Sequence, residues 1–69
     1  MSGVGNRLRA LREAKAMTQA QLGAALDVSR QTIIALESGR YMASLELSLK
    51  IARHFLQPVE AIFWLQDGQ

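Results

Sequence analysis

The stretch that decides the fold runs from Thr18 to Arg40 and reads TQAQLGAALDVSRQTIIALESGR. It opens on a capping box, in which the side chain of Gln21 reaches back to the capping residue Thr18. Ser29 is a second N-cap, and Gly39 is a typical residue just beyond the end of a helix. The sequence therefore predicts two short capped helices joined by a tight turn, the first ending near Leu26 and the second running from about Ser29 to Ser38.

The apolar residues of this stretch favour a helix-turn-helix, in which two short helices cross at a steep angle. Gly23 is expected where the two helices approach closely, because only a very small residue fits there. Asp27 is expected at the turn, because Asp tolerates left-handed backbone geometry better than most residues. The contacts that hold the two helices together are predicted at Leu22, Leu26, Val28, Ile33 and Leu36.

The polar residues of the second helix are suited to reading DNA. Its first turn, the end that enters a major groove, carries Arg30, Gln31 and Thr32. Arg can pair with guanine and Gln with adenine through two hydrogen bonds, and a Thr methyl can touch a thymine methyl. These three residues are therefore predicted to contact bases.

Four further residues are predicted to contact DNA phosphates. Gln19 lies at the positive end of the first helix of the pair, and Arg40 lies just beyond Gly39. Ser29 and Arg7 complete the predicted phosphate contacts. For Arg7, a solvated helix face is an equally good interpretation.

The rest of the chain predicts three more helices. One runs from about Val4 to Ala16 with Ser2 or Asn6 as its cap, and a short one begins at Pro58 and reaches Phe63 or Trp64. A third, from about Leu45 to Leu56, is capped by Ser44. Its alternating apolar residues are a strand signature in isolation, but the cap and the length favour a helix; they are Leu45, Leu47, Leu49 and Ile51.

These elements predict an all-α fold, a compact five-helix domain over residues 1–69. Residues 1–4 are expected to be disordered. Residues 65–69 are expected to form a tail, either frayed or folded into a short C-terminal strand.

Composition limits the function. The chain has 69 residues, no cysteine and one histidine, His54, with no clustered ligands, so we expect no metal site and no cofactor. We find no nucleophile–base pair and no phosphate-binding loop, which argues against an enzyme with catalytic residues.

Because no apolar run approaches a membrane span and no secretory signal is found, we expect a cytoplasmic protein without membrane contact. Residues 1–40 carry a net charge of +3 and residues 41–69 one of −1, a weak signal for a polyanionic partner.

A domain of this size is marginally stable. Because disulfides and metals are excluded, we expect self-association to supply the additional stability. The C-terminal region carries more large apolar residues than one small core hides comfortably. Simple core filling is the alternative interpretation of this set. We predict a homodimer whose interface contains Phe55, Phe63, Trp64 and Leu65.

Taken together, the sequence resembles the Cro/repressor-type helix-turn-helix family, in particular its small stand-alone regulators similar to the cytolysin repressor. The resemblance covers residues 6–64. The matching segments are Asn6-Arg7-Leu8, Leu11-Arg12, Met17–Leu22, Val28–Ile33, Glu37–Tyr41, Ser44–Leu47, Lys50–Ala52 and Val59–Phe63.

The resemblance implies roles that spacing does not show. It implies that Ile34 joins Arg30 and Gln31 at the bases, and that Arg12 and Glu37 form an internal ion pair. It also implies a homodimeric repressor that binds an inverted-repeat operator in double-stranded DNA. The two chains of this dimer would be held together partly by their C-terminal segments. With no room for a ligand domain, any inducing signal would act through a second, regulatory protein.

Three departures from the family pattern stand in the sequence. Asp27 replaces the usual Gly of the turn, and Met42-Ala43 replaces an Asn-Pro pair, so a loop contact to DNA is in doubt. Ile34 is apolar at a position that is often polar, which suggests contact with a thymine methyl or an unusual packing role.

The alternative function is a protein-interaction or antitoxin-like module that masks a partner through its apolar C-terminal face. A copurifying partner that covers Trp64 would distinguish this module from a stand-alone regulator.

Overall fold

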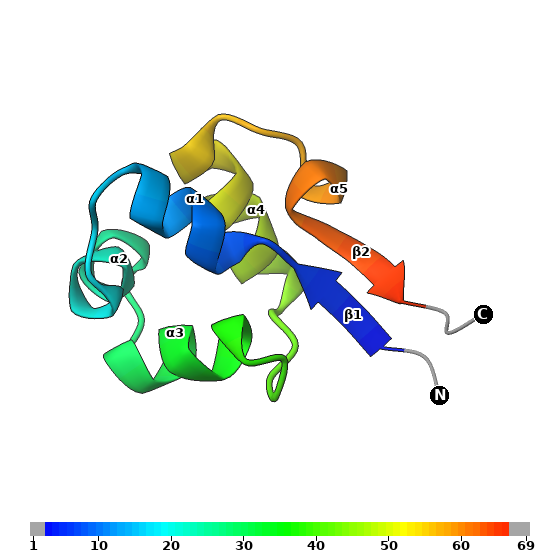
Figure 1. Cartoon of the computed structure of the whole chain (residues 1–69), viewed down its shortest axis with the longest axis horizontal. Helices are drawn as coiled ribbons and strands as arrows, with labels where there is room; N and C mark the ends of the chain where they lie inside the picture. Colours follow the sequence, from blue (N-terminus) through cyan, green and yellow to red (C-terminus); the bar gives the residue numbers. More distant parts are fainter. Residues whose placement is uncertain (1–2, 67–69) are drawn as a thin grey trace.

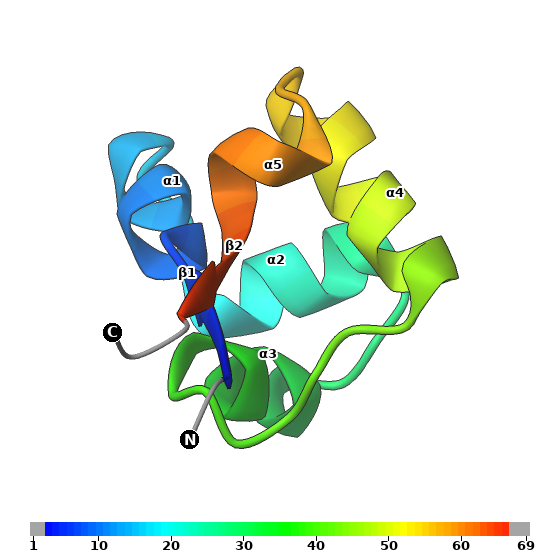
Figure 2. The ribbon, with the colours of Figure 1, turned by 90° about the vertical axis from the view of Figure 1, so that its right-hand side faces the viewer.

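The computed structural model describes residues 3–66, which form five helices and a two-stranded sheet (Figure 1). The elements in chain order are β1 (Gly3–Asn6), α1 (Leu8–Ala14), α2 (Gln19–Leu26), α3 (Arg30–Glu37), α4 (Leu45–Phe55), α5 (Val59–Ile62) and β2 (Phe63–Gln66). The predicted five-helix architecture with a helix-turn-helix is confirmed, and of the two alternatives for the C-terminal segment the structure has the short strand. When the molecule is turned by 90°, α4 runs along one side of the domain and the loop from α3 to α4 lies in front (Figure 2).

The three predicted side-chain caps fix where α2, α3 and α4 begin. Thr18, Ser29 and Ser44 each accept a hydrogen bond from the backbone N–H three residues later, on Gln21, Thr32 and Leu47. The capping box is complete, because the backbone N–H of Thr18 donates to Oε1 of Gln21 at 2.8 Å. Each cap satisfies a donor that a helix start otherwise leaves without a partner, so these starts are determined locally.

One apolar core joins the helices. Its central side chains come from all five helices, so each helix buries its apolar face only against the others. The residues predicted to hold α2 and α3 together are part of this core, with Val28 half-buried at its edge. The buried apolar residues are Leu8, Leu22, Leu26, Ile33, Leu36, Leu47, Ile51, Phe55 and Ile62.

The two ends of the described chain pair as an antiparallel sheet. Gly3 lies opposite Gln66 and Asn6 opposite Phe63. The first predicted helix is present, but its expected start at Val4 was wrong, since residues 3–6 belong to β1 and not to a helix or a disordered end. The helix α1 starts at Leu8, where the side chain of Asn6 accepts the Leu8 N–H at 3.0 Å.

The C-terminal prediction also needs correction. The fifth helix ends at Ile62, and the strand β2 begins at Phe63, where the sequence predicted helix up to Phe63 or Trp64. Residues 65 and 66 lie in this strand; residues 1–2 and 67–69 fall outside the described part of the chain. The reason for the strand is a partner far away in sequence, since β2 pairs with β1 and not with a neighbouring segment.

The turn between α2 and α3 is built as predicted. Asp27 adopts left-handed backbone geometry with φ of 62° and caps the C-terminus of α2. Gly23 is buried, and a Cβ atom there would lie 2.8 Å from the carbonyl oxygen of Val28. The absence of a side chain at Gly23 therefore sets how closely the turn packs on α2.

We expect Gly23→Ala to lower the free energy of unfolding by roughly 1–3 kcal/mol, because the added methyl must displace backbone rather than a flexible side chain. Urea denaturation monitored by circular dichroism measures this loss. Gly3→Ala is the matched control, because a Cβ there would meet nothing within 4 Å. If the two variants had equal free energies of unfolding, the turn at Val28 could move away from α2 to make room for the methyl group without loss of stability.

None of the helices in residues 3–66 has the length and apolar character needed to cross a membrane.

Candidate nucleic-acid interface

The outward side of α3 offers polar side chains at its N-terminal turn. Arg30 and Gln31 are exposed, and within residues 3–66 no hydrogen bond from either side chain to another residue is found. Ile34 is 38% exposed, on the same side of the helix as Gln31 three residues earlier. Arg30, Gln31 and Ile34 are therefore free to meet the edges of bases in a major groove.

Thr32 is less available than the sequence suggested. Its backbone N–H donates to Oγ of Ser29, and the two hydroxyl oxygens lie 3.0 Å apart. The side chain is half-buried. Thr32 and Ser29 thus form the local structure that starts α3, and any contact of either with DNA would have to share these hydroxyls.

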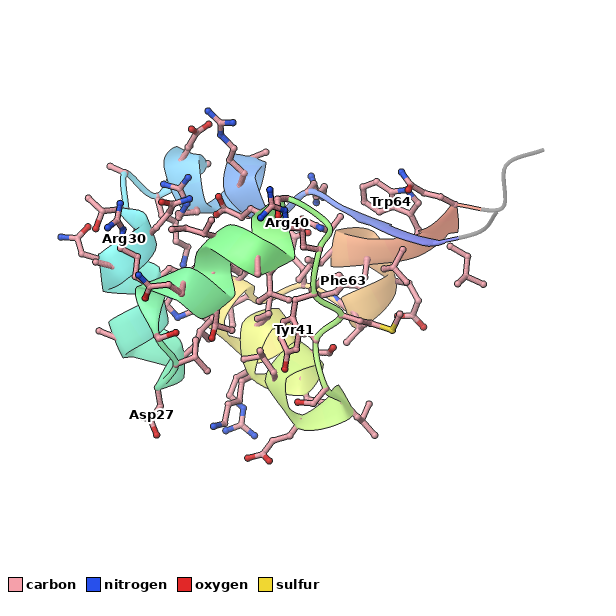
Figure 3. The ribbon with its side chains drawn as sticks, turned by 90° about the horizontal axis from the view of Figure 1, so that it is seen from below. Asp27, Arg30, Arg40, Tyr41, Phe63 and Trp64 are labelled. Atoms are coloured by element: carbon pink, nitrogen blue, oxygen red, sulfur yellow. The ribbon has the colours of Figure 1, made fainter. Side chains whose placement is uncertain are left out.

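Beyond the C-terminal end of α3, the chain turns at Gly39 and presents Arg40. Gly39 has φ of +80°, a left-handed conformation that Gly adopts without strain. Arg40 is exposed, and no carboxylate of residues 3–66 lies within ion-pair distance of it. Arg30 and Arg40 therefore stand near the two ends of α3 (Figure 3).

A buried ion pair holds α1 against α3. Nε of Arg12 donates to Glu37 at 2.6 Å, and Nη2 donates to the other carboxylate oxygen at 3.2 Å. The third donor, Nη1, bonds the carbonyl oxygen of Met17 at 2.8 Å. The two side chains are only 11% and 6% exposed, so the pair is largely screened from solvent.

The pKa of Arg12 is raised, first by the hydrogen bond to Glu37, while burial acts in the opposite direction. A raised pKa contributes fully to stability at every pH below the unfolded-state pKa, and this contribution is lost only as the pH rises through the folded-state pKa. The Arg12 guanidinium is therefore charged throughout the working range, and the pair does not act as a pH switch through Arg12.

The same carboxylate positions a predicted phosphate contact. Nε2 of Gln19, the first residue of α2, donates to Oε1 of Glu37 at 3.2 Å. An amide nitrogen has two hydrogens, so one is left to donate outward beside the positive end of α2. Glu37 thus fixes the orientation of Gln19 as well as that of Arg12.

Arg7 does not fit the predicted phosphate role. Its guanidinium donates to the carbonyl oxygen of Ala61 at 2.7 Å and to the side chain of Gln57. Ala61 belongs to α5, and α5 lies on the opposite side of the domain from α3 (Figures 1 and 2). Arg7 therefore ties the start of α1 to α5, which is a structural role.

The predicted dimer residues divide into two groups. Phe55 is wrong as an interface residue, because it is buried in the core of its own chain. Phe63 is half-buried and packs against that core. Trp64 and Leu65 are exposed, by 42% and 79%, although the indole of Trp64 lies over Gly5. Figure 3 shows Phe63 and Trp64 projecting to opposite sides of β2, as successive residues of a strand do.

One residue of the outward face was missed. Ser38 is exposed and lies on the same side of α3 as Gln31 and Ile34, at spacings of seven and four residues. Its hydroxyl donates to the carbonyl oxygen of Ala35 at 3.1 Å. The helical spacing could have identified Ser38, but the sequence interpretation treated it only as the helix end.

The chain is similar to known regulators over most of its length. The family model described as helix-turn-helix matches residues 8–59. An uncharacterised HTH-type transcriptional regulator of Bacillus subtilis is 40% identical, with 90% of this chain and 94% of that protein covered. A second, from Methanocaldococcus jannaschii, is 45% identical over 93% of this chain and 97% of that protein.

A solved structure agrees with this assignment. The restriction-modification controller protein C.AhdI from Aeromonas hydrophila matches with a TM-score of 0.70 and 30% identity, with 78% of each chain covered. The chain therefore belongs to the Cro/C1-type helix-turn-helix family, and it is a DNA-binding transcriptional regulator rather than an enzyme.

Proposed function

We propose that the protein is a sequence-specific repressor that binds an inverted-repeat operator as a homodimer. The observation that carries the proposal is the exposed N-terminal turn of α3, where Arg30 and Gln31 have no partner among residues 3–66 and Ile34 stands beside them. Arg30 is assigned to a guanine, Gln31 to an adenine and Ile34 to a thymine methyl. Thr32 is a secondary base contact, limited by its bond to Ser29.

The phosphate contacts proposed for the DNA backbone lie on either side of these base contacts. Gln19 and Arg40 are the principal ones, with Ser29 at the start of α3. A phosphate contact from the start of α2 is supported by the orientation that Glu37 gives to the amide of Gln19. Such contacts fix the register of the protein on DNA and make binding depend on salt.

The homodimer is proposed because one recognition helix contacts only a few bases. Each good pair contributes about 1–3 kcal/mol of discrimination, which is too little to select one site in a genome. Two copies on half-sites about 34 Å apart double the number of base contacts. The symmetry of such a dimer requires an inverted repeat, and occupation of a promoter by the dimer would repress transcription.

Selection of bound sites from random DNA duplexes tests this proposal. We expect the selected sites to share a short half-site that occurs twice, as an inverted repeat with centres about one helical turn apart. A single half-site without a repeat would contradict the homodimer. Loss of any common sequence would contradict base reading by α3.

A protein-masking role is the second candidate. The exposure of Leu65 on β2 favours it, because a large apolar side chain at 79% exposure is well suited to burial against a partner. A partner that binds there would shift the fluorescence of Trp64, the single tryptophan of the chain. Such a partner is compatible with DNA binding by α3 and would supply the regulatory signal.

A further inference from the structure

The helix α4 has two apolar faces. One, formed by Leu47, Ile51 and Phe55, is buried in the core. The other carries Leu45 and Leu49, which are 75% and 55% exposed. These two leucines are four residues apart, so they lie side by side on the helix surface. The strand-like alternation of the sequence arises because two helical stripes are interleaved.

The exposed face continues to the end of the helix. Ala52 follows Leu49 by three residues and is half-buried, and Leu56, which caps α4 in left-handed geometry, is 86% exposed. The stripe Leu45, Leu49, Ala52 and Leu56 repeats at the spacing of a helix that packs on another helix. We call these four residues the outer stripe of α4.

Charged residues flank the outer stripe on one side. Glu46, Lys50 and Arg53 lie along it, and with Leu45 and Leu49 they line a shallow hollow on the surface. Lys50 approaches Glu46 at 3.6 Å. Arg53 has no carboxylate within 4.0 Å among residues 3–66. The acidic group therefore lies near the start of the helix and an unpaired basic group near its end.

We propose that the outer stripe packs against the outer stripe of a second copy of this chain, with the two α4 helices antiparallel. This surface rests on the homodimer proposed above and gives it a location. When α4 meets its own copy across a two-fold axis between Leu49 and Lys50, residue 46 of each chain comes opposite residue 53 of the other. Glu46 then faces Arg53 of the second copy, and the symmetry makes this pair twice.

A second copy fits the outer stripe because this charge pattern is complementary to itself. An interface around a two-fold axis uses the same patch on both chains, so it needs opposite charges at equal distances from the axis. Glu46 and Arg53 meet that requirement, while Leu45, Leu49 and Leu56 supply apolar area along the outer stripe beside them. A domain of this length also gains needed stability from association.

A charge exchange tests the pairing. Glu46→Arg alone and Arg53→Glu alone each place like charges opposite one another twice, and we expect dimer dissociation constants about tenfold higher at low salt. The double variant Glu46→Arg/Arg53→Glu restores opposite charges and should regain the wild-type constant. Sedimentation velocity across a dilution series measures each constant. Single variants that dimerise like wild type, or a double variant no better than the singles, would overturn the antiparallel pairing.

The apolar part is tested with Leu49→Glu against Leu65→Glu, which changes an exposed apolar side chain on β2. We expect Leu49→Glu to weaken the dimer about 100-fold, because one leucine is lost from each chain, and Leu65→Glu to leave it intact. Circular dichroism confirms that both variants are folded; because Leu49 is outside the core, its replacement should leave the helix content unchanged. A dimer lost only in Leu65→Glu would place the interface on β2 and overturn the outer stripe while leaving the homodimer standing. A wild-type chain that is monomeric at every concentration, and also on DNA, would refute the homodimer itself.

Discussion

Glu37→Ala is expected to destabilise this domain strongly, as much as truncation of a core side chain. It leaves the Arg12 guanidinium buried without its carboxylate, and removal of one partner of a buried pair typically costs about 3–5 kcal/mol. Arg12 cannot escape by losing its proton, because an arginine stays charged at any practical pH. A domain of this length has a free energy of unfolding of only about 5 kcal/mol. We therefore expect Glu37→Ala to be largely unfolded at moderate temperature.

Urea or thermal unfolding followed by circular dichroism measures this loss. The informative control is the double variant Arg12→Met/Glu37→Leu, which replaces both charges by apolar side chains of similar size. Such replacements of a buried pair are often neutral or stabilising. We therefore expect the double variant to recover most of the lost stability. A loss below about 1 kcal/mol in Glu37→Ala would mean that solvent reaches Arg12 freely and that α1 and α3 are held by the apolar core alone.

Gln31→Ala is expected to have the largest effect on recognition. The Gln31 side chain is exposed on the first turn of α3 and suits an adenine, and loss of such a contact costs about 1–3 kcal/mol in each half-site. Affinity for the selected operator should fall accordingly, while affinity for unrelated duplex DNA should hardly change. Titrations of both duplexes at one fixed salt concentration measure the two losses.

Arg40→Ala provides the contrast. Arg40 is placed for a phosphate, so its removal should weaken operator and unrelated DNA alike and reduce the slope of log affinity against log salt by about one per half-site. If Gln31→Ala instead lowered both affinities equally, Gln31 would be a backbone contact and direct base reading by this residue would be refuted.

The local signals of the sequence were sufficient for the helix-turn-helix. Thr18, Ser29 and Ser44 identified the starts of three helices because a cap needs only a side chain and a backbone N–H three residues away. Gly23 and Asp27 were located correctly for the same reason: the geometry of a tight turn depends on a few neighbouring residues.

The strand β1 and its pairing with β2 could not be predicted in the same way. The two strands lie at opposite ends of the described chain, and β1 contains two glycines, which are poor strand residues. The spacing of Val4, Leu8 and Leu11 also imitates a helix face, although Val4 belongs to β1. Only a contact between residues far apart in sequence makes the segment extended.

The errors in the predicted site arose because the sequence does not show which side chains are buried and which are exposed. Phe55 was assigned to an interface because composition counts apolar residues but does not tell which of them face the core. Leu45 and Leu49 were grouped with the other apolar residues of the predicted helix, although both are exposed. Arg7 looked available for phosphate because the sequence does not show that α5 comes within reach of its guanidinium.

The pairing of β1 with β2 has a mechanical consequence. Gly3 and Gln66 lie opposite each other at the outer end of an antiparallel ladder. Tension applied through the two chain ends would pull this ladder apart sideways, so its hydrogen bonds would break one pair after another, beginning at Gly3 and Gln66. The indole of Trp64 would separate from Gly5 before the force reaches the N-caps of α2 and α3. The sheet would therefore be the first part of the domain to unfold.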